Sequence, residues 1–322
     1  MGEAAAVTEK KKLVILTGPT AVGKTALSLK LAGRIGGEII SADSMQVYRG
    51  MDIGSAKATP QERALIPHHL IDLLDPSEEF HVVRFQEEAR RAIEDIASRG
   101  KIPIMTGGTG FYIQAVLYDI DFTEAAEDAQ YRQMLEEKAR TEGNEALHAM
   151  LAEADPASAA AIHANNVKRV IRALEYYHET GNRISEHNEA ERQRKSPYCS
   201  AYFVLNDERS RVYERINRRV DEMMKQGLPE EVDGLRRKGY TRDLVSMQGL
   251  GYKELLAYFD GEMSLEEAVE TIKRDTRHFA KRQLTWFRRE RDVIWVNKNS
   301  FGYDDEKILD YMMEILKQKG IL

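Results

Sequence analysis

Residues 13–25 read LVILTGPTAVGKT, and this stretch decides the fold class of the 322-residue chain. It starts with Leu13–Thr17, a short apolar run of the kind found in strands that are buried on both faces. The residues after it match the pattern G-x-x-x-x-G-K-[ST] in full. A helix is predicted directly afterwards, over Ala26–Ile35, because apolar residues recur there at helical spacing. A strand, a glycine loop and a helix in this order identify a phosphate-binding loop.

The phosphate-binding loop has the groups that a phosphate requires. Its glycines let backbone N–H groups converge on phosphate oxygens, and the N-terminus of the following helix adds the positive end of its dipole. Lys24 brings a compact positive charge, and the hydroxyl of Thr25 is a predicted ligand of Mg²⁺. The residues predicted to bind the phosphate groups are Gly18, Pro19, Thr20, Ala21, Val22, Gly23, Lys24 and Thr25.

Further short apolar runs predict the rest of the sheet. A helical pattern at Phe85–Ser98 separates two of them, and strands that alternate with helices indicate a mostly parallel sheet with helices on both faces. The expected fold is therefore α/β, with a P-loop NTPase-like parallel sheet as its core. The additional strands are predicted at Glu38–Ala42, Ile102–Thr106, Ala201–Leu205 and Val293–Val296.

The middle of the chain contains no convincing strand and is rich in Ala, Glu and Arg, so we predict a helical insertion domain there. Strand-like patterns return after it, and the core is therefore expected to be discontinuous. Long helices are predicted at Asp207–Tyr240 and Ser264–Arg291. The predicted divisions are a flexible leader at 1–12, a core at 13–121 and 197–322, and a helical insertion at 122–196.

Composition restricts the class of protein. Apolar residues make up 42% of the chain and charged residues 31%, which is typical of a folded soluble protein. No apolar run is long enough to predict a membrane span. The single cysteine, Cys199, excludes an intramolecular disulfide and fits a reducing compartment. We expect a cytoplasmic protein that has no membrane partner and works as a monomer.

Positive charge is concentrated near the end of the chain. The segment Lys273–Arg291 contains eight Lys or Arg residues against Asp275 and Glu290, although the whole chain has a net charge of −6. A run of this kind is ordinarily a solvated helix face. A polyanionic substrate would give it a binding role instead.

Three loops that follow predicted strands should meet in one cleft, because ligands of open α/β sheets bind beyond the carboxyl ends of the strands. They are the phosphate-binding loop, the segment that begins at Asp43, and Gly107-Gly108-Thr109-Gly110. An acidic group beside bound phosphates acts as a metal ligand or a general base, but Asp43 could equally cap a helix or stabilise a turn. No strand ends in the acidic pair of a Walker-B site, which argues against a nucleotide kinase.

Beyond the phosphate-binding loop, motifs along nearly the whole chain resemble the bacterial tRNA dimethylallyltransferase (tRNA isopentenyltransferase) family, in the family's order. One departure is Ser55, where the family commonly has threonine. The motifs are SADSMQVYRGMDIGSAK (41–57), HHLID (68–72), GGTGFYIQAV (107–116), NVKRVIRALEYYHETG (166–181), RINRRVDEM (215–223), QGLGYKEL (248–255) and AKRQLTWFR (280–288).

The resemblance implies transfer of a dimethylallyl group from dimethylallyl diphosphate to the exocyclic N6 amine of an adenine. That adenine lies directly 3′ of the anticodon in tRNAs that read codons beginning with U. By resemblance Asp43 is the general base, and Thr109 contacts the adenine and the transferring group. Charge that develops on the leaving diphosphate is expected to be stabilised by Lys24, by Mg²⁺ on Thr25 and by an arginine. Arg219 is the first candidate for that arginine, and Arg215 is the second.

The resemblance also implies contacts with the anticodon stem-loop of the tRNA. The target adenine must leave its stacked loop to reach a cleft, as bases do in other base-modifying enzymes. On the helix expected at Ser264–Arg291, basic side chains lie on a different face from Ile272, Phe279 and Trp286, which are expected in the core. The residues predicted to bind tRNA are Asp43, Ser44, Met45, Gln46, Thr109, Lys168, Arg169, Val170, Ile171, Arg172, Arg274, Arg277, Lys281, Arg282 and Arg288.

Three other functions remain as alternatives. An adenylate isopentenyltransferase acting on AMP or ADP would share the loop and the base, but it needs neither a basic face nor a helical insertion. A P-loop small-molecule kinase would need a γ-phosphate site and a lid. A binding module for tRNA would need neither Asp43 nor an intact phosphate loop. The adjacent His68 and His69 are expected to be structural, because no acidic partner stands at metal-ligand spacing.

Overall fold

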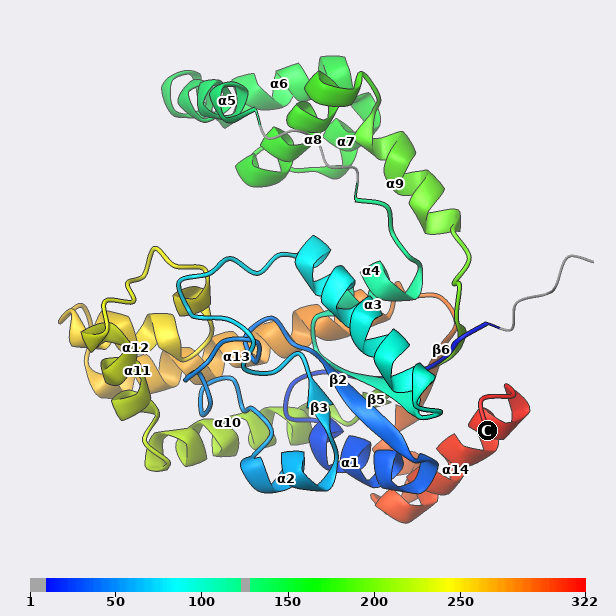
Figure 1. Cartoon of the computed structure of the whole chain (residues 1–322). Coiled ribbons are helices and arrows are strands. Elements are labelled where there is room, and N and C mark those ends of the chain that lie inside the picture. Colours follow the sequence, from blue (N-terminus) through cyan, green and yellow to red (C-terminus); the bar gives the residue numbers. More distant parts are fainter. Residues whose placement is uncertain (1–9, 123–127) are drawn as a thin grey trace, which may run out of the picture. The chain divides into compact units, whose positions relative to one another are not determined.

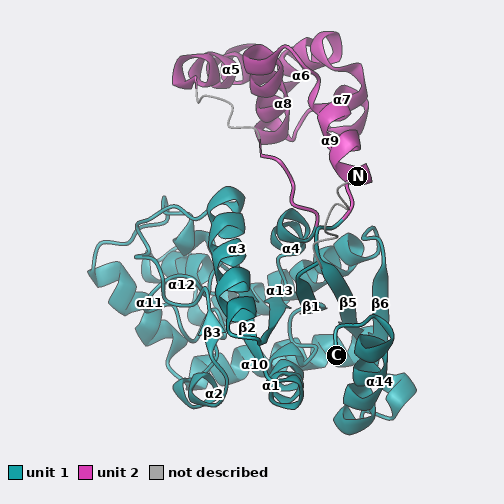
Figure 2. Cartoon of the chain, turned by 45° about the vertical axis from the view of Figure 1, so that its right-hand side comes forward, with its two compact units in different colours: residues 1–117, 196–322 teal, residues 118–195 magenta. Residues whose placement is uncertain are grey.

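The computed structural model describes residues 10–122 and 128–322, and the chain divides into two compact units. Unit 1 combines the residues up to 117 with 196–322, and unit 2 is 118–195 (Figure 2). The sequence predicts the insertion at 122–196. The predicted leader was too long by at least its last residue, because Lys12 is the first residue of a strand. The rest of the leader up to residue 9 lies outside the described residues.

Unit 1 is built on a six-stranded sheet in the order β3-β2-β4-β1-β5-β6, and all of its strand pairs are parallel. The predicted α/β fold is therefore confirmed, and each of the five predicted strands is present. Because the central strands are buried on both faces, they are continuous apolar runs without alternation. The strands are β1 Lys12–Thr17, β2 Gly37–Ala42, β3 His68–His69, β4 Ile102–Gly107, β5 Cys199–Asn206 and β6 Val293–Asn297.

Helices cover both faces of the sheet (Figure 1). On one face α1 (Lys24–Ile35) and α14 (Asp305–Gln318) share a core with the sheet, in which Leu31 and Met312 are fully buried. Helices α3 (Val82–Ser98) and α4 (Gly110–Leu117) pack together against β2 and β4. This arrangement leaves the carboxyl ends of the strands as the place where loops gather.

The long helix predicted at Asp207–Tyr240 is two helices, α10 (Arg209–Lys225) and α11 (Leu228–Arg237). Gly227 separates them with a left-handed φ of 99°, a conformation that glycine adopts without strain. Near the other predicted long helix, α13 spans Leu265–Phe287 and lies beside α10 and α12. The remaining elements of unit 1 are α2 (Pro60–Leu65), α12 (Tyr252–Phe259), and the 3₁₀ turns η1 (Ser246–Gln248) and η2 (Lys298–Phe301).

The secondary-structure elements in the described part of unit 2 are all helices. Its core contains Leu135, Leu147, Leu151 and Leu174 at full or nearly full burial. The carboxylate of Asp155 is also fully buried, and it accepts hydrogen bonds from the backbone and side chains of Ser158 and Ser185. The helices are α5 (Ala129–Glu142), α6 (Asn144–Ala154), α7 (Pro156–Ala161), α8 (Val167–Thr180) and α9 (Ile184–Gln193).

The edge strand β3 is absent from the sequence prediction, because two residues are too few to give a periodic signal. It holds the histidine pair. His69 Nε2 lies 2.8 Å from Glu38 Oε2, and His68 Nδ1 lies 2.7 Å from the carbonyl of Ile66. Within residues 10–122 and 128–322, no helix has the length and apolar character needed to cross a membrane.

Candidate active site

The phosphate-binding loop connects β1 to α1 and has an unusual backbone. Gly18 has a φ of 147°, Ala21 one of 61° and Gly23 one of 101°. A side chain at Gly18 would place its Cβ 2.2 Å from the carbonyl oxygen of Leu205 on β5, so only glycine fits. The loop is thereby held against the sheet, with the N-terminus of α1 directed at its centre.

Lys24 closes the phosphate-binding loop on itself. Its Nζ donates to the carbonyl oxygens of Gly18, at 2.9 Å, and Pro19, at 2.8 Å. Burial and the nearby charge of Arg219 together lower the pKa of Lys24 to about 7, although the charge of Asp43 opposes them. An anion bound in the loop would raise the pKa of Lys24 again, because a nearby negative charge favours the protonated amine.

A cavity of about 550 Å³ opens in front of the phosphate-binding loop. It brings the loop together with Asp43 after β2, with Gly108 after β4, and with side chains of α10 and α13. The sequence predicts that these loops converge at the carboxyl ends of the strands, and the cavity lining agrees for all three. The side chain predicted from the third loop, Thr109, is the exception. Thr109 is half-buried and is not among the residues that line the cavity. Its backbone N–H instead donates to the carbonyl of Ala42, at 3.2 Å.

Asp43 lines the cavity and also stabilises a turn. Its Oδ1 accepts a hydrogen bond from the backbone N–H of Met45 at 2.9 Å. The alternative that Asp43 caps a helix is wrong, since the chain after it forms turns and the next helix begins at Pro60. A turn takes only one carboxylate oxygen, so the turn and the general-base interpretations are compatible.

Three arginines of α10 line the cavity, Arg215, Arg218 and Arg219, and Arg218 pairs with Glu214 at 2.9 Å. Burial lowers the pKa of Arg219, and the charges of Asp43 and Glu222 oppose this effect. Arg215 forms an ion pair with the buried carboxylate of Asp207, at 2.7 Å, and its Nη1 lies 3.5 Å from the carbonyl of Val22. Of the cavity arginines in the described residues, Arg219 is therefore the one without a close ion pair to a carboxylate. Arg215 is held by Asp207, just before the N-terminus of α10.

The glycines of the Gly107–Gly110 segment are explained by packing. A Cβ at Gly107 would lie 2.1 Å from the carbonyl oxygen of Ala42, and one at Gly110 would lie 2.2 Å from the ring of Trp286. A Cβ at Gly108 would lie 2.1 Å from Nε2 of Gln283. The segment is glycine-rich because β2 and α13 pack directly on it.

Gln283 is a site residue that the sequence analysis did not single out. It is 6% exposed, lines the cavity, and bonds to both the phosphate-binding loop and Gly108. One available signal was its position on α13, between Phe279 and Trp286 on the face expected in the core. A polar residue on such a face requires buried partners. Phe279 and Trp286 themselves are half-buried, and Phe279 lines the cavity.

The segment Asp43–Gln46 is partly committed to contacts within the protein. The amide of Gln46 accepts from Ser41 Oγ at 2.8 Å and donates to the carbonyls of Ser55 and Ala56 at 3.3 Å. Ser44 and Met45 are half-buried. Of this segment, Asp43 and Gln46 line the cavity.

Two residues predicted to bind tRNA are buried in unit 2. Val170 is fully buried and Ile171 is 4% exposed, and both belong to the core of that unit. Their side chains cannot contact RNA, so this part of the prediction is wrong. Lys168, Arg169 and Arg172 lie on the exposed side of the same helix, α8. The helical period of 3.6 residues separates the two groups.

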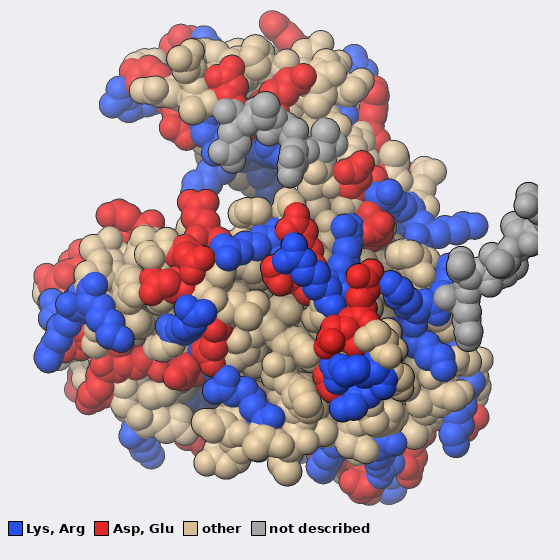
Figure 3. Space-filling view, viewed as in Figure 1, with Lys and Arg blue, Asp and Glu red and all other residues tan. Residues whose placement is uncertain are grey.

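The basic residues of α13 differ in their surroundings. Arg277 is half-buried and donates to Asn217 Oδ1 at 2.6 Å, so part of its guanidinium is engaged within the protein. Arg274 pairs with Asp275, whereas Lys281, Arg282 and Arg288 are exposed. On the face shown in Figure 3, acidic and basic side chains of unit 1 are interspersed rather than segregated.

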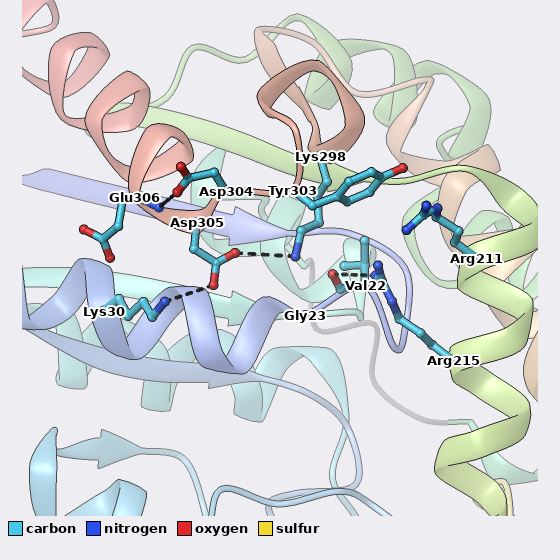
Figure 4. Close-up of a pocket in the computed structure, with 10 residues that line it drawn as sticks. All are labelled: Val22, Gly23, Lys30, Arg211, Arg215, Lys298, Tyr303, Asp304, Asp305 and Glu306. Carbon is cyan, nitrogen blue, oxygen red and sulfur yellow. Dashed lines mark hydrogen bonds and ion pairs between the residues drawn. The ribbon is translucent and has the colours of Figure 1, made fainter.

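A second cavity, of about 630 Å³, adjoins the same loop and shares Gly23 and Arg215 with the first (Figure 4). Its charged groups are largely paired with one another. Asp305 pairs with Lys30 at 3.1 Å and with Lys298 at 3.6 Å, and Arg211 lies over the ring of Tyr303 at 4.2 Å. Its lysines are therefore less available to an anion than Lys24.

Comparison with known proteins identifies the family. A family model described as "IPP transferase" matches residues 46–290, and one described as "Isopentenyl transferase" matches residues 11–69. A tRNA dimethylallyltransferase of Lachnoclostridium phytofermentans is 60% identical over 310 residues, which are 96% of this chain and 99% of the relative. The chain belongs to the tRNA dimethylallyltransferase family.

Other members of the tRNA dimethylallyltransferase family agree in sequence and in fold. The enzyme of Geobacillus thermodenitrificans is 52% identical over 94% of this chain and 96% of its own length. The crystal structure of the tRNA isopentenylpyrophosphate transferase from Bacillus halodurans matches with a TM-score of 0.73, at 46% identity over 97% of this chain and 98% of that chain. A eukaryotic dimethylallyltransferase acting on tRNA matches with a TM-score of 0.78, at 33% identity over 89% of this chain and 74% of that chain.

Proposed function

We propose that the protein transfers a dimethylallyl group from dimethylallyl diphosphate to the N6 amine of the adenine 3′ of the anticodon. The proposed tRNAs read codons that begin with U. One observation carries the proposal. A single cavity is lined by Lys24 and Thr25 of the phosphate-binding loop and by Asp43 and Arg219. A site for an anionic leaving group and a carboxylate base thus share one cavity, which suits alkyl transfer to a weak nucleophile.

The chemistry assigns a role to each of these groups. The exocyclic amine of adenine is a poor nucleophile because its lone pair is delocalised into the ring. A carboxylate that takes the amine proton during attack offsets this, and Asp43 is the carboxylate in the cavity. As the bond from the allylic carbon to oxygen breaks, negative charge grows on the diphosphate. Lys24, Arg219 and the backbone N–H groups of the loop stabilise this charge.

The residues present fit one Mg²⁺ ion held together with the diphosphate. No group of three or more His, Cys, Asp or Glu side chains suited to a metal occurs among the described residues, so a fully protein-bound ion is not supported there. Mg²⁺ commonly uses one or two protein oxygens and completes its shell with phosphate oxygens and water. The Thr25 hydroxyl, at the exposed start of α1, is the proposed protein ligand. When bound, the ion would neutralise charge on the leaving group.

The anticodon stem-loop is the proposed macromolecular substrate. The adenine would leave its stack to enter the cavity, as bases do in other enzymes that modify them. Lys281 and Arg282 of α13 and Arg288 at its C-terminal cap are exposed and suited to phosphate contacts. Lys168, Arg169 and Arg172 in unit 2 are exposed as well. The proposed working form is a monomer.

The test uses separate reactions, each containing the protein, Mg²⁺ and dimethylallyl diphosphate labelled in its dimethylallyl group. The acceptor is total tRNA in one reaction, AMP in the second and ADP in the third. Label should enter tRNA alone. Nuclease digestion and mass spectrometry should then locate N6-isopentenyladenosine next to the anticodon. Label in AMP or ADP with none in tRNA would establish the adenylate isopentenyltransferase alternative. Rapid Mg²⁺-dependent ATP turnover without transfer of label would favour a kinase.

A further inference from the structure

Gln283 links two loops that lie far apart in the sequence. Its Oε1 accepts a hydrogen bond from the backbone N–H of Thr20, at 2.8 Å. Its Nε2 donates to the carbonyl oxygen of Gly108, at 2.9 Å. The side chain is 6% exposed; its bond to Gly108 is buried and its bond to Thr20 is part-buried. A single buried amide thus joins the phosphate-binding loop to the loop after β4.

The link continues from Gly108 to the segment that carries Asp43. The next residue, Thr109, donates its backbone N–H to the carbonyl of Ala42 at 3.2 Å, and Ala42 directly precedes Asp43. The missing side chain of Gly108 makes room for the amide, since a Cβ there would lie 2.1 Å from Nε2 of Gln283. Gln283 therefore stands between the loop that would hold the diphosphate and the segment that holds the carboxylate base.

We propose that Gln283 is a positioning residue for the transfer reaction. It sets the distance and orientation between the bound diphosphate and Asp43, through Thr20 on one side and Gly108 on the other. This inference rests on the proposed function, because it concerns the alignment of the two substrates. Alignment is worth much in such a reaction, and a displacement of about 1 Å between reacting groups can cost about 10²-fold in rate.

The helix itself does not depend on Gln283 for its place. Helix α13 is also anchored by Ile272, Ala280 and Phe287, which are between 0% and 2% exposed. Apolar packing of this kind would keep the helix docked if the amide were lost. A methionine has a similar length, cannot donate to Gly108 and offers Thr20 only a weak acceptor, so it separates the role of the amide from that of the side-chain volume.

The first test compares Gln283→Met with the wild-type enzyme under single-turnover conditions. We expect the transfer rate to fall by about 10²-fold, with much smaller changes in the dissociation constants for inorganic diphosphate and tRNA. The matched control is Ile272→Val, which removes buried volume from the same helix away from both loops. It should lower the melting temperature and leave the transfer rate unchanged.

The second test is Gln283→Glu, which keeps the acceptor for Thr20. A carboxylate cannot donate to Gly108, but a protonated carboxyl group can. The rate of the variant relative to wild type should therefore rise as pH falls from about 8 to about 6, since burial raises the pKa of a carboxyl group. The other charged residues that line the cavity are Lys24, Asp43, Glu62, His68, Arg215, Arg218, Arg219 and Glu222, and the ratio to wild type removes the pH effects that the two enzymes share.

The two tests distinguish positioning from a purely structural role. A Gln283→Met enzyme with a lowered melting temperature and a wild-type transfer rate would overturn the proposal. A ratio for Gln283→Glu that does not change with pH would overturn it as well. Wild-type transfer to tRNA, measured in the same assay, reports on the proposed function independently of either variant.

Discussion

Binding of dimethylallyl diphosphate is predicted to be accompanied by proton uptake at Lys24. In the free protein, burial and the charge of Arg219 lower the pKa of this amine to about 7, against an ordinary value of 10.5. The bound diphosphate supplies negative charge beside Nζ, so the pKa of Lys24 should return toward its ordinary value in the complex. Above about pH 7 the free protein has lost this proton, and binding must restore it.

The size of the effect follows from the shifted pKa. About half of the free protein has a charged Lys24 at pH 7, and about one hundredth has it at pH 9. If only the charged form binds well, the affinity for the diphosphate should fall about 50-fold over this range, which corresponds to about 2.3 kcal/mol. Close to one proton should be taken up per molecule bound near the upper end of the range.

Isothermal titration calorimetry measures this uptake directly. Titrations at about pH 8 in two buffers that differ in ionisation enthalpy should give apparent enthalpies that differ by the proton uptake multiplied by that difference. Lys24→Met is the control, because any uptake that persists belongs to the ligand or to other groups. Equal uptake by the wild-type protein and Lys24→Met would refute the assignment of the proton to Lys24.

Three further predictions concern other residues. Asp43→Asn should lower the transfer rate by about 10²–10⁴-fold, as for loss of a general base, with little change in tRNA affinity; a fully active variant would remove Asp43 from the base role. Lys281→Ala should weaken tRNA binding and reduce its log–log salt slope by about 0.7, whereas an unchanged slope would make Lys281 a solvated charge. Asp155→Ala should destabilise unit 2 by about 1–3 kcal/mol in urea unfolding, because the buried donors of Ser158 and the part-buried donors of Ser185 lose their acceptor. Burial by itself raises the pKa of Asp155, but these hydrogen bonds outweigh it and lower the pKa. The stabilisation should therefore be present above about pH 4 and lost as the pH falls below it. A wild-type stability that does not decline below this pH would contradict the assignment.

The sequence alone determined the α/β architecture of the core and led to the proposed phosphate site. The strands are continuous apolar runs, and the loop at Gly18–Thr25 needs particular backbone angles that only a few residue patterns permit. These signals are local, because a buried strand and a phosphate-binding loop are encoded within about ten neighbouring residues. The motifs from residue 41 to residue 288 pointed to the family for the same reason, since each one is a short stretch with its own composition.

The tertiary structure decided which residues meet. Val170 and Ile171 belong to a motif of the family, but helix α8 turns them into the core of unit 2. Arg277 has the same charge as its neighbours, and only the packing of α13 beside α10 gives it Asn217 as a partner. The role of Gln283 depends on two loops that are 263 and 175 residues away along the chain. Contacts across such separations arise from packing between elements, and a pattern read along one element contains no record of its partner.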